Sequence, residues 1–169
     1  MTPALSAPGI VLRPLVLSDA PALFVALGDA EVQRYRRAAA HKDVAETSAY
    51  IEDTLARSFA AWAITEDGGE AMGRLALRVK DGAGEFGIVL RRAAQRRGLG
   101  GKALTLAEGY AFGALNLTAL RADIDAENAP SLALFRASGF CREAFKPAHR
   151  QTKLGLRDSI ILEKPRPLL

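Results

Sequence analysis

A glycine-rich segment between a predicted strand and a predicted helix limits the fold of this chain more than any other feature. It follows a strand-like run at 85–90, precedes apolar residues at helical spacing over 100–115, and reads Gln95-Arg96-Arg97-Gly98-Leu99-Gly100-Gly101-Lys102. Glycines let a backbone approach a ligand closely, and the unpaired N–H groups at a helix N-terminus suit phosphate oxygens, as do flanking arginines. The segment therefore predicts a loop that binds a pyrophosphate-bearing ligand, with a plain turn before a helix as the alternative.

The predicted elements on the two sides of this loop differ in kind. Before it we expect a strand at 10–15, helices at 18–28 and 44–59, and three strands at 62–65, 72–79 and 85–90, whose glycine-containing connections indicate an antiparallel meander. After it, the helix at 100–115 is followed by a strand at 117–124, a helix at 130–138, and strands at 140–144 and 158–162. Alternation of strand and helix implies a crossover with parallel pairing.

These elements predict one α/β domain over residues 1–169, because no repeat, low-complexity tract or linker divides the chain. We expect a mixed, mostly antiparallel sheet with helices on both faces. Pro165 and Pro167 interrupt strand pairing, so residues 164–169 are expected to form a loose tail.

Composition argues against several other classes of protein. No run approaches the roughly 18 apolar residues of a membrane span, and the first residues lack the basic start and apolar run of a signal peptide. Cys141 is the only cysteine, so neither an internal disulfide nor a zinc cluster is expected, no metal is predicted, and a cytoplasmic location fits best. The basic stretch at 91–102 is not interleaved with aromatic residues, which argues against nucleic acid as a partner.

Two other phosphate-binding loops fit the segment poorly. The P-loop pattern requires a glycine and a Ser or Thr where this chain has Arg96 and Ala103. The dinucleotide fingerprint G-x-G-x-x-G/A does match Gly98, Gly100 and Ala103, with Asp123 downstream. However, residues 91–97 separate that match from the strand, and the preceding strands form a meander rather than a βαβ unit.

A third loop fits better, and it comes with a second motif. Gln95-x-x-Gly98-x-Gly100 resembles the acetyl-CoA loop of the GNAT superfamily, Q/R-x-x-G-x-G/A. Downstream, the stretch from Asn128 through Ser131 to Gly139-Phe140 is similar to the family's Asn-x-x-Ser…Gly-Phe segment. The resemblance covers nearly the whole chain, and it implies the GNAT fold and acetyl-CoA-dependent N-acetyltransfer by direct attack in a ternary complex.

Within the superfamily the chain looks most like the ribosomal-protein N-terminal acetyltransferase (RimJ/RimL-like) branch. The similarity lies in Leu12-Arg13-Pro14-Leu15…Asp19-Ala20, in Glu85-Phe86-Gly87, and in Arg157-Asp158-Ser159-Ile160. That branch includes enzymes for protein N-termini, free amino acids and antibiotics. The resemblance therefore implies an amine acceptor without naming it, and it leaves open whether the protein forms a homodimer.

The resemblance also implies a place for acetyl-CoA. Gly87 within a strand indicates a bulge, and in the family a bulge here splays two parallel strands around the pantetheine arm. That arm is expected to pair with the backbone of Ile88, Val89 and Leu90 and to run past Asn128, Ser131 and Phe135. The pyrophosphate is expected at the loop, held by the amides of Leu99, Gly100 and Gly101 with Lys102, while Arg96 and Arg97 face its oxygens.

The catalytic candidates are fewer. Glu85, beside the expected bulge, is predicted to act as a general base through water, with Asp123 and Asp125 as weaker candidates. Many family members have a proton-donating tyrosine where this chain has Phe135, so we expect Ser131, one helical turn earlier, to protonate the departing thiolate. Without that tyrosine, the alternative is a non-catalytic acetyl-CoA sensor.

The acceptor surface is expected to be basic. In the family it includes the loop between the last two strands, which here carries Lys146, His149, Arg150, Lys153 and Arg157. Such a loop would repel a polyamine, and an α-amine, with a pKa near 8, needs only a modest base. We therefore expect a protein N-terminus or an amino-acid-like small molecule as acceptor.

Overall fold

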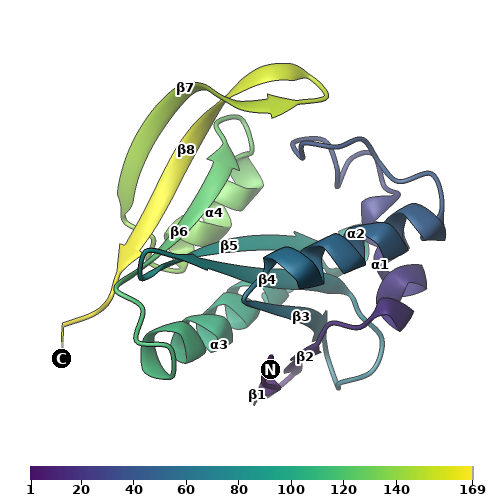
Figure 1. Ribbon diagram of the computed structural model, residues 1–169, viewed down its shortest axis with the longest axis horizontal. Helices are drawn as coiled ribbons and strands as arrows, with labels where there is room; N and C mark the ends of the chain where they lie inside the picture. The colour runs from purple at the N-terminus through teal and green to yellow at the C-terminus, as the bar shows by residue number, and fades with distance from the viewer. Residues whose placement is uncertain (169) are drawn as a thin grey trace.

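The computed structural model describes residues 1–168, which form an eight-stranded sheet with helices on both faces (Figure 1). The strand order is β1-β2-β3-β4-β5-β6-β8-β7, and β5 and β6 form the one parallel pair in this part of the chain. The strands are β1 (Leu5–Ala7), β2 (Ile10–Pro14), β3 (Ala60–Thr65), β4 (Gly73–Lys80), β5 (Ala83–Leu90), β6 (Ala119–Asp125), β7 (Arg142–Thr152) and β8 (Gly155–Pro165). The mixed, mostly antiparallel sheet is the predicted one.

Two cores, one on each face, hold the helices to the sheet. The helices are α1 (Ala20–Leu27), α2 (Val44–Arg57), α3 (Leu99–Gly113) and α4 (Ala129–Ala137). Apolar side chains of α1 and α2 pack with one face of β3 and β4, including Ala61, Ala63 and Ala76. Those of α3 and α4 pack with the other face, including Trp62 and Leu75. Alternation along β3 and β4 therefore supplies both cores, which is why β3 and the Leu75–Leu77 run of β4 are almost wholly apolar.

Helix ends follow local chemistry. Asp43 caps α2 by accepting the N–H of Glu46, and the Glu46 carboxylate accepts the N–H of Lys42 in return. Asn128 caps α4 in the same way, with its Oδ1 accepting the N–H of Ser131 at 3.3 Å. The predicted cap at Ser18-Asp19 is instead a short 3-10 turn, Leu17–Asp19, before α1.

The parallel pair separates early. Pairing between β5 and β6 covers Ala83 to Glu85 on β5, and beyond Glu85 the two strands diverge. The predicted bulge at Gly87 is wrong, because β5 keeps an unbroken register with β4 from Ala83 to Leu90. Gly87 serves a tertiary contact instead: the Arg74 guanidinium donates to its carbonyl at 3.0 Å and lies where a Cβ would point.

The expectation of a loose tail from residue 164 onward is wrong for Lys164 and Pro165. β8 continues through Lys164 and Pro165, which face Leu120 and Ala119 of β6. Proline is tolerated there because β7 begins opposite Glu163, so Pro165 has no β7 residue across from it that would need its missing N–H. Lys164 is also half-buried and donates to the Glu108 carboxylate and the Ser138 carbonyl.

Candidate active site

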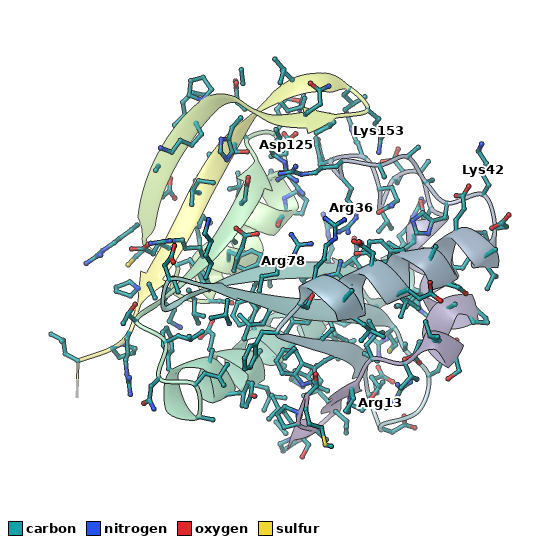
Figure 2. All side chains as sticks on the ribbon, in the orientation of Figure 1. Arg13, Arg36, Lys42, Arg78, Asp125 and Lys153 are labelled. Carbon is teal, nitrogen blue, oxygen red and sulfur yellow. The ribbon has the colours of Figure 1, made fainter. Side chains whose placement is uncertain are left out.

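A cavity of about 510 Å³ opens where β5 and β6 diverge. One wall is formed by β4 and β5, including Arg78, Glu85 and Gly87, and the opposite wall by β6 and the start of α4. α2 and the segment between α1 and α2 complete the lining. The tip of the β7–β8 hairpin contacts that segment, where the Lys153 ammonium donates to the carbonyls of Gln33 and Ala38 (Figure 2).

The divergence leaves backbone groups of β5 facing the gap. Ile88, Val89 and Leu90 pair with β4 on one side only, since the ladder to β6 has already ended at Glu85. An extended, amide-containing ligand can pair with such an edge as an added strand does. The Leu90 carbonyl already accepts the Gln95 side-chain amide at 3.1 Å, so Gln95 ties the glycine loop to the end of β5.

The glycine loop presents backbone donors at the start of α3. Gly98 has φ = 76°, a left-handed conformation that favours glycine, and its carbonyl accepts the first helical hydrogen bond, from the Lys102 N–H at 3.1 Å. The N–H groups of Leu99, Gly100 and Gly101 precede that bond and have no intrahelical acceptor. They lie at the positive end of the helix dipole, which suits a pyrophosphate.

The residues predicted to bind the pyrophosphate differ in their burial and contacts. Gly100 is buried, and a Cβ there would lie 3.2 Å from the Leu134 side chain, so it permits close packing of α3 on α4. The Lys102 ammonium lies on the Pro8 carbonyl at 3.4 Å, and Arg97 pairs with Glu66. Arg96 is exposed at φ = 58° and has no side-chain hydrogen bond or ion pair within residues 1–168.

A second hollow, about 390 Å³, lies beside this loop. It is lined by small and apolar side chains of α3 and α4 and by a residue of β1, namely Ala7, Gly101, Lys102, Thr105, Leu106, Leu134, Ala137 and Ser138. This second hollow lies at the first turn of α3, whereas the first cavity follows β5 from Glu85 to Ile88. An elongated ligand with a phosphate in its middle fits this arrangement.

One of the carboxylates that line the cavity has no hydrogen-bond or ion-pair partner among the described side chains. Of the four that line it within the described residues, Asp53 pairs with Arg57, Asp123 accepts from Arg150, and Asp125 pairs with Arg157. Glu85 is exposed to the cavity and has neither a hydrogen bond nor an ion pair from the described side chains. It is therefore the carboxylate best placed to accept a proton from a ligand.

Asp125, by contrast, is held as an anion. Burial opposes its ionisation, but hydrogen bonds from Arg157 and from the Glu127 N–H lower its pKa below the ordinary value. Through the Glu127 contact, Asp125 also caps the turn that precedes Asn128. A carboxylate so strongly paired is a poor base.

The start of α4 brings the other predicted residues to the cavity. Asn128, Ser131 and Phe135 all line it. Because Asn128 caps the helix, the Ser131 hydroxyl is not used as the cap. The Phe135 ring is buried and packs edge-on against Phe140, with ring centroids 5.0 Å apart, and it carries no exchangeable proton.

Two arginines of the β7–β8 hairpin are paired with carboxylates. Arg150 lies against Asp123, with His149 beside it, and Arg157 pairs with Asp125 and Glu127. Lys153 donates to neutral carbonyl groups, which do not balance its charge. The expected positive charge of this hairpin is therefore reduced at Arg150 and Arg157, and a basic acceptor surface stays a prediction. Positive charge gathers elsewhere in the cavity, on Arg36, Arg74 and Arg78, which sequence reasoning missed.

A signal for one of these arginines was present. Arg74 directly precedes the apolar run Leu75-Ala76-Leu77, in a part of β4 that is buried on both faces. A charged residue at such a position is rare and has a specific contact when it occurs. Arg36 lies in an irregular segment, where no periodic pattern indicates which side chains point inward.

Two further findings concern the described residues. None of the helices within 1–168 is long and apolar enough to cross a membrane. No group of three or more His, Cys, Asp or Glu side chains in that range is arranged to hold a metal ion.

Comparison with known proteins agrees with this geometry. A family model described as "Acetyltransferase (GNAT) domain" matches residues 10–141. The uncharacterized N-acetyltransferase p20 of Bacillus licheniformis is 27% identical over an alignment of 157 residues, and the match covers 88% of each chain.

Solved structures share the fold. RimJ of Mycobacterium smegmatis, in complex with CoA-disulfide, superposes with a TM-score of 0.82 at 21% identity, over 96% of this chain and 86% of that one. Spermidine N-acetyltransferase of Vibrio cholerae, in complex with CoA and spermine, superposes with a TM-score of 0.80 at 16% identity, over 95% and 97%. With the family model covering most of its length, the chain belongs to the GNAT family of acetyl-CoA-dependent N-acetyltransferases.

Proposed function

We propose that this enzyme acetylates the primary amine of a protein N-terminus or an amino-acid-like small molecule, with Glu85 as general base. The observation that carries the proposal is the uncommitted Glu85 carboxylate in the cavity at the point where β5 and β6 diverge. Solved structures with this fold include one described as a ribosomal-protein-serine acetyltransferase and a spermidine N-acetyltransferase, so their names cover both protein and small-molecule amines.

The residues present fit acetyl-CoA, which supplies the activated acetyl thioester. The amides of Leu99, Gly100 and Gly101 suit its pyrophosphate, and the unpaired edge of β5 at Ile88 and Val89 suits the amide groups of its pantetheine arm. The apolar hollow between α3 and α4 suits a base or ribose. The gap between the strands then directs the thioester toward Glu85.

Acetyl transfer needs a neutral amine as nucleophile and a proton for the departing thiolate. The amine nitrogen forms a bond to the acetyl carbon, the bond from that carbon to sulfur breaks, and the amine proton passes to Glu85 directly or through water. An α-amine, with a reference pKa near 8, is partly neutral at physiological pH, so a carboxylate suffices as acceptor of its proton. Ser131 is proposed to pass a proton to the sulfur and to take one from water in the same step, because it lines the cavity and its hydroxyl is not used as the helix cap.

Coenzyme A release tests the proposal. The protein is mixed with acetyl-CoA and a panel of amines: peptides with free N-termini, amino acids, and polyamines. We expect release with at least one α-amine and a kcat/KM for Glu85→Gln lower by roughly 10²–10⁴-fold. The matched control is Glu52→Gln, an exposed α2 carboxylate outside the cavity lining. Release at the wild-type rate by Glu85→Gln would exclude the base role.

A further inference from the structure

Two arginines share one hydroxyl in the wall of the active-site cavity. Arg74 is 6% exposed, and its guanidinium donates to the Gly87 carbonyl and to the Tyr50 hydroxyl. Arg36, from the segment before α2, donates to the same hydroxyl at 2.8 Å. Both guanidinium carbons lie over the Tyr50 ring, at 5.3 and 5.8 Å from its centroid. Side chains of three elements thus converge on Tyr50.

Neither arginine has a carboxylate partner within residues 1–168. The other arginines with little exposed surface do: Arg13 pairs with Asp19, Arg150 with Asp123, and Arg91 with Glu70. The Nε of Arg74 is buried with no acceptor at all. Burial lowers the pKa of Arg36 to about 10, while burial and repulsion from Arg36 and Arg78 lower that of Arg74 well below its ordinary value. A buried cation without a counter-ion costs several kcal/mol, so this cluster needs an explanation.

The cluster lies in the cavity that contains Glu85. Arg74, Ala76 and Arg78 share one face of β4, and across the register they oppose Val89, Gly87 and Glu85 of β5. Ala76 and Gly87, the smallest residues of this face, form the floor of the cavity between Arg74 and Glu85. Arg36 lies over this floor from the opposite side, and Figure 2 shows Arg36 and Arg78 in the same space between α2 and the β7–β8 hairpin.

We propose that Arg36 and Arg74 bind a carboxylate of the acetyl acceptor. The proposal rests on the proposed function and names its substrate class: a small zwitterion whose amine lies toward Glu85 and whose carboxylate lies on the two guanidinium groups. The planar guanidinium is the side chain best matched to a carboxylate.

Charge placement favours a zwitterion over other amines. The cavity is positive at Arg36 and Arg74 and negative at Glu85. The Arg74 guanidinium reaches the Gly87 carbonyl at 3.0 Å, and Gly87 and Glu85 are adjacent positions on one strand face, only about 7 Å apart. A compact molecule with one amine and one carboxylate complements both ends. A polyamine would place a second cation against unpaired guanidinium groups, and a peptide N-terminus has its own carboxyl group tied up as an amide.

The test compares acids with their amides. The probes are the standard L-amino acids and their α-carboxamides, with aminoethyl phosphate and spermidine as further probes. Binding is measured by calorimetry in the presence of CoA, and turnover by release of CoA from acetyl-CoA. We expect at least one amino acid to bind roughly thirtyfold or more tightly than its amide, equivalent to about 2 kcal/mol.

The outcomes separate the subsite from the reaction. Equal binding of every acid and its amide overturns the subsite, even if amines are acetylated. Tighter binding of aminoethyl phosphate or spermidine than of any amino acid also overturns it. Tight binding of an acid without turnover supports the subsite and contradicts the proposed function.

Variants then locate the effect. Arg74→Met and Arg36→Met should raise KM for the amino acid roughly thirtyfold and raise KM for its amide much less. Arg142→Met, an exposed arginine on β7 paired with Glu163, is the matched control. Because Arg74→Met removes a buried unpaired charge, its melting temperature should not fall. A lower melting temperature with an unchanged KM would mean that the cluster is structural, which contradicts the proposal.

Discussion

Replacing Gly101 by aspartate should move stability and coenzyme A binding in opposite directions. Gly101 is the third residue of α3, and a Cβ at this position meets nothing within 4 Å, so the fold can accept a side chain there. Gly100 does not offer this test, because a Cβ there meets Leu134 at 3.2 Å and any loss of binding could follow from displaced packing.

The stability change follows from the helix start. A carboxylate in the first turn interacts favourably with the helix dipole, and replacing glycine reduces the entropy lost on folding. Together these effects should raise the free energy of unfolding by about 1 kcal/mol. A small rise in melting temperature is therefore expected for Gly101→Asp.

The binding change follows from charge repulsion. If the pyrophosphate lies on the amides of Leu99, Gly100 and Gly101, the new carboxylate stands about 5 Å from a phosphate. Coulomb repulsion at that distance is about 1 kcal/mol in water and about 3 kcal/mol at the lower effective dielectric of a protein surface. The Kd for CoA should therefore rise roughly fivefold to two-hundredfold.

Titration calorimetry with CoA measures this change, and Gly101→Asn is the control that keeps the shape without the charge. The difference between the two variants should shrink as salt is added, since ions screen exposed charges. If Gly101→Asp binds CoA as tightly as Gly101→Asn at low salt, the N-terminus of α3 does not hold the phosphates.

Three further results are expected. Acetyl-CoA should raise the melting temperature, by a stabilisation of about 2.7 kcal/mol at a hundredfold excess over Kd, while NAD should not; a shift with NAD alone would favour a dinucleotide site. Ser131→Ala should lower kcat roughly tenfold with little change in acetyl-CoA affinity, the loss of about one neutral hydrogen bond, while Phe135→Leu should keep near-normal kcat; a wild-type rate for Ser131→Ala would assign the proton to water or substrate. The pKa of Asp125 is lower in the folded than in the unfolded protein, so its ionised form stabilises the fold at pH values above the unfolded-state pKa. This stabilisation is lost as the pH falls through the folded-state pKa. Asp125→Asn should therefore unfold with a weaker acid dependence than wild type in denaturant titrations, and an identical dependence would contradict the pairing with Arg157.

Local patterns predicted most of this architecture because they depend on neighbours in the chain. The meander of β3, β4 and β5 follows from alternating apolar runs and glycine turns, and the start of α3 follows from Gly98. Strand lengths were less predictable: β7 is almost wholly exposed and carries charged residues throughout, so it lacks the apolar alternation that marks a half-buried strand.

Site residues were predictable where their own secondary-structure element positions them, and not where a contact between distant segments of the chain does. Glu85 and Ser131 lie on predicted elements and Asn128 just before one, and the structure brings all three to one cavity. Gly87 was assigned to a bulge because a glycine within a strand is typical of one. The prediction failed because Arg74, a residue of another strand, occupies the space beside this glycine. Arg36 meets Tyr50 only because the segment after α1 folds back over the sheet, and no spacing in the sequence encodes that contact.

The engagement of both chain ends limits where the protein can be shortened or tagged. The Trp62 indole donates to the Pro3 carbonyl at 2.7 Å, and the Arg166 N–H donates to the Thr118 carbonyl at 2.9 Å. A chain truncated after Glu163 would leave the buried Glu108 carboxylate without its ammonium partner from Lys164. Removing one member of a buried ion pair costs about 3–5 kcal/mol, a large share of the stability of a small domain. Affinity tags and fluorescent labels therefore belong before Thr2 or after Arg166, where they extend the chain without cutting into the sheet.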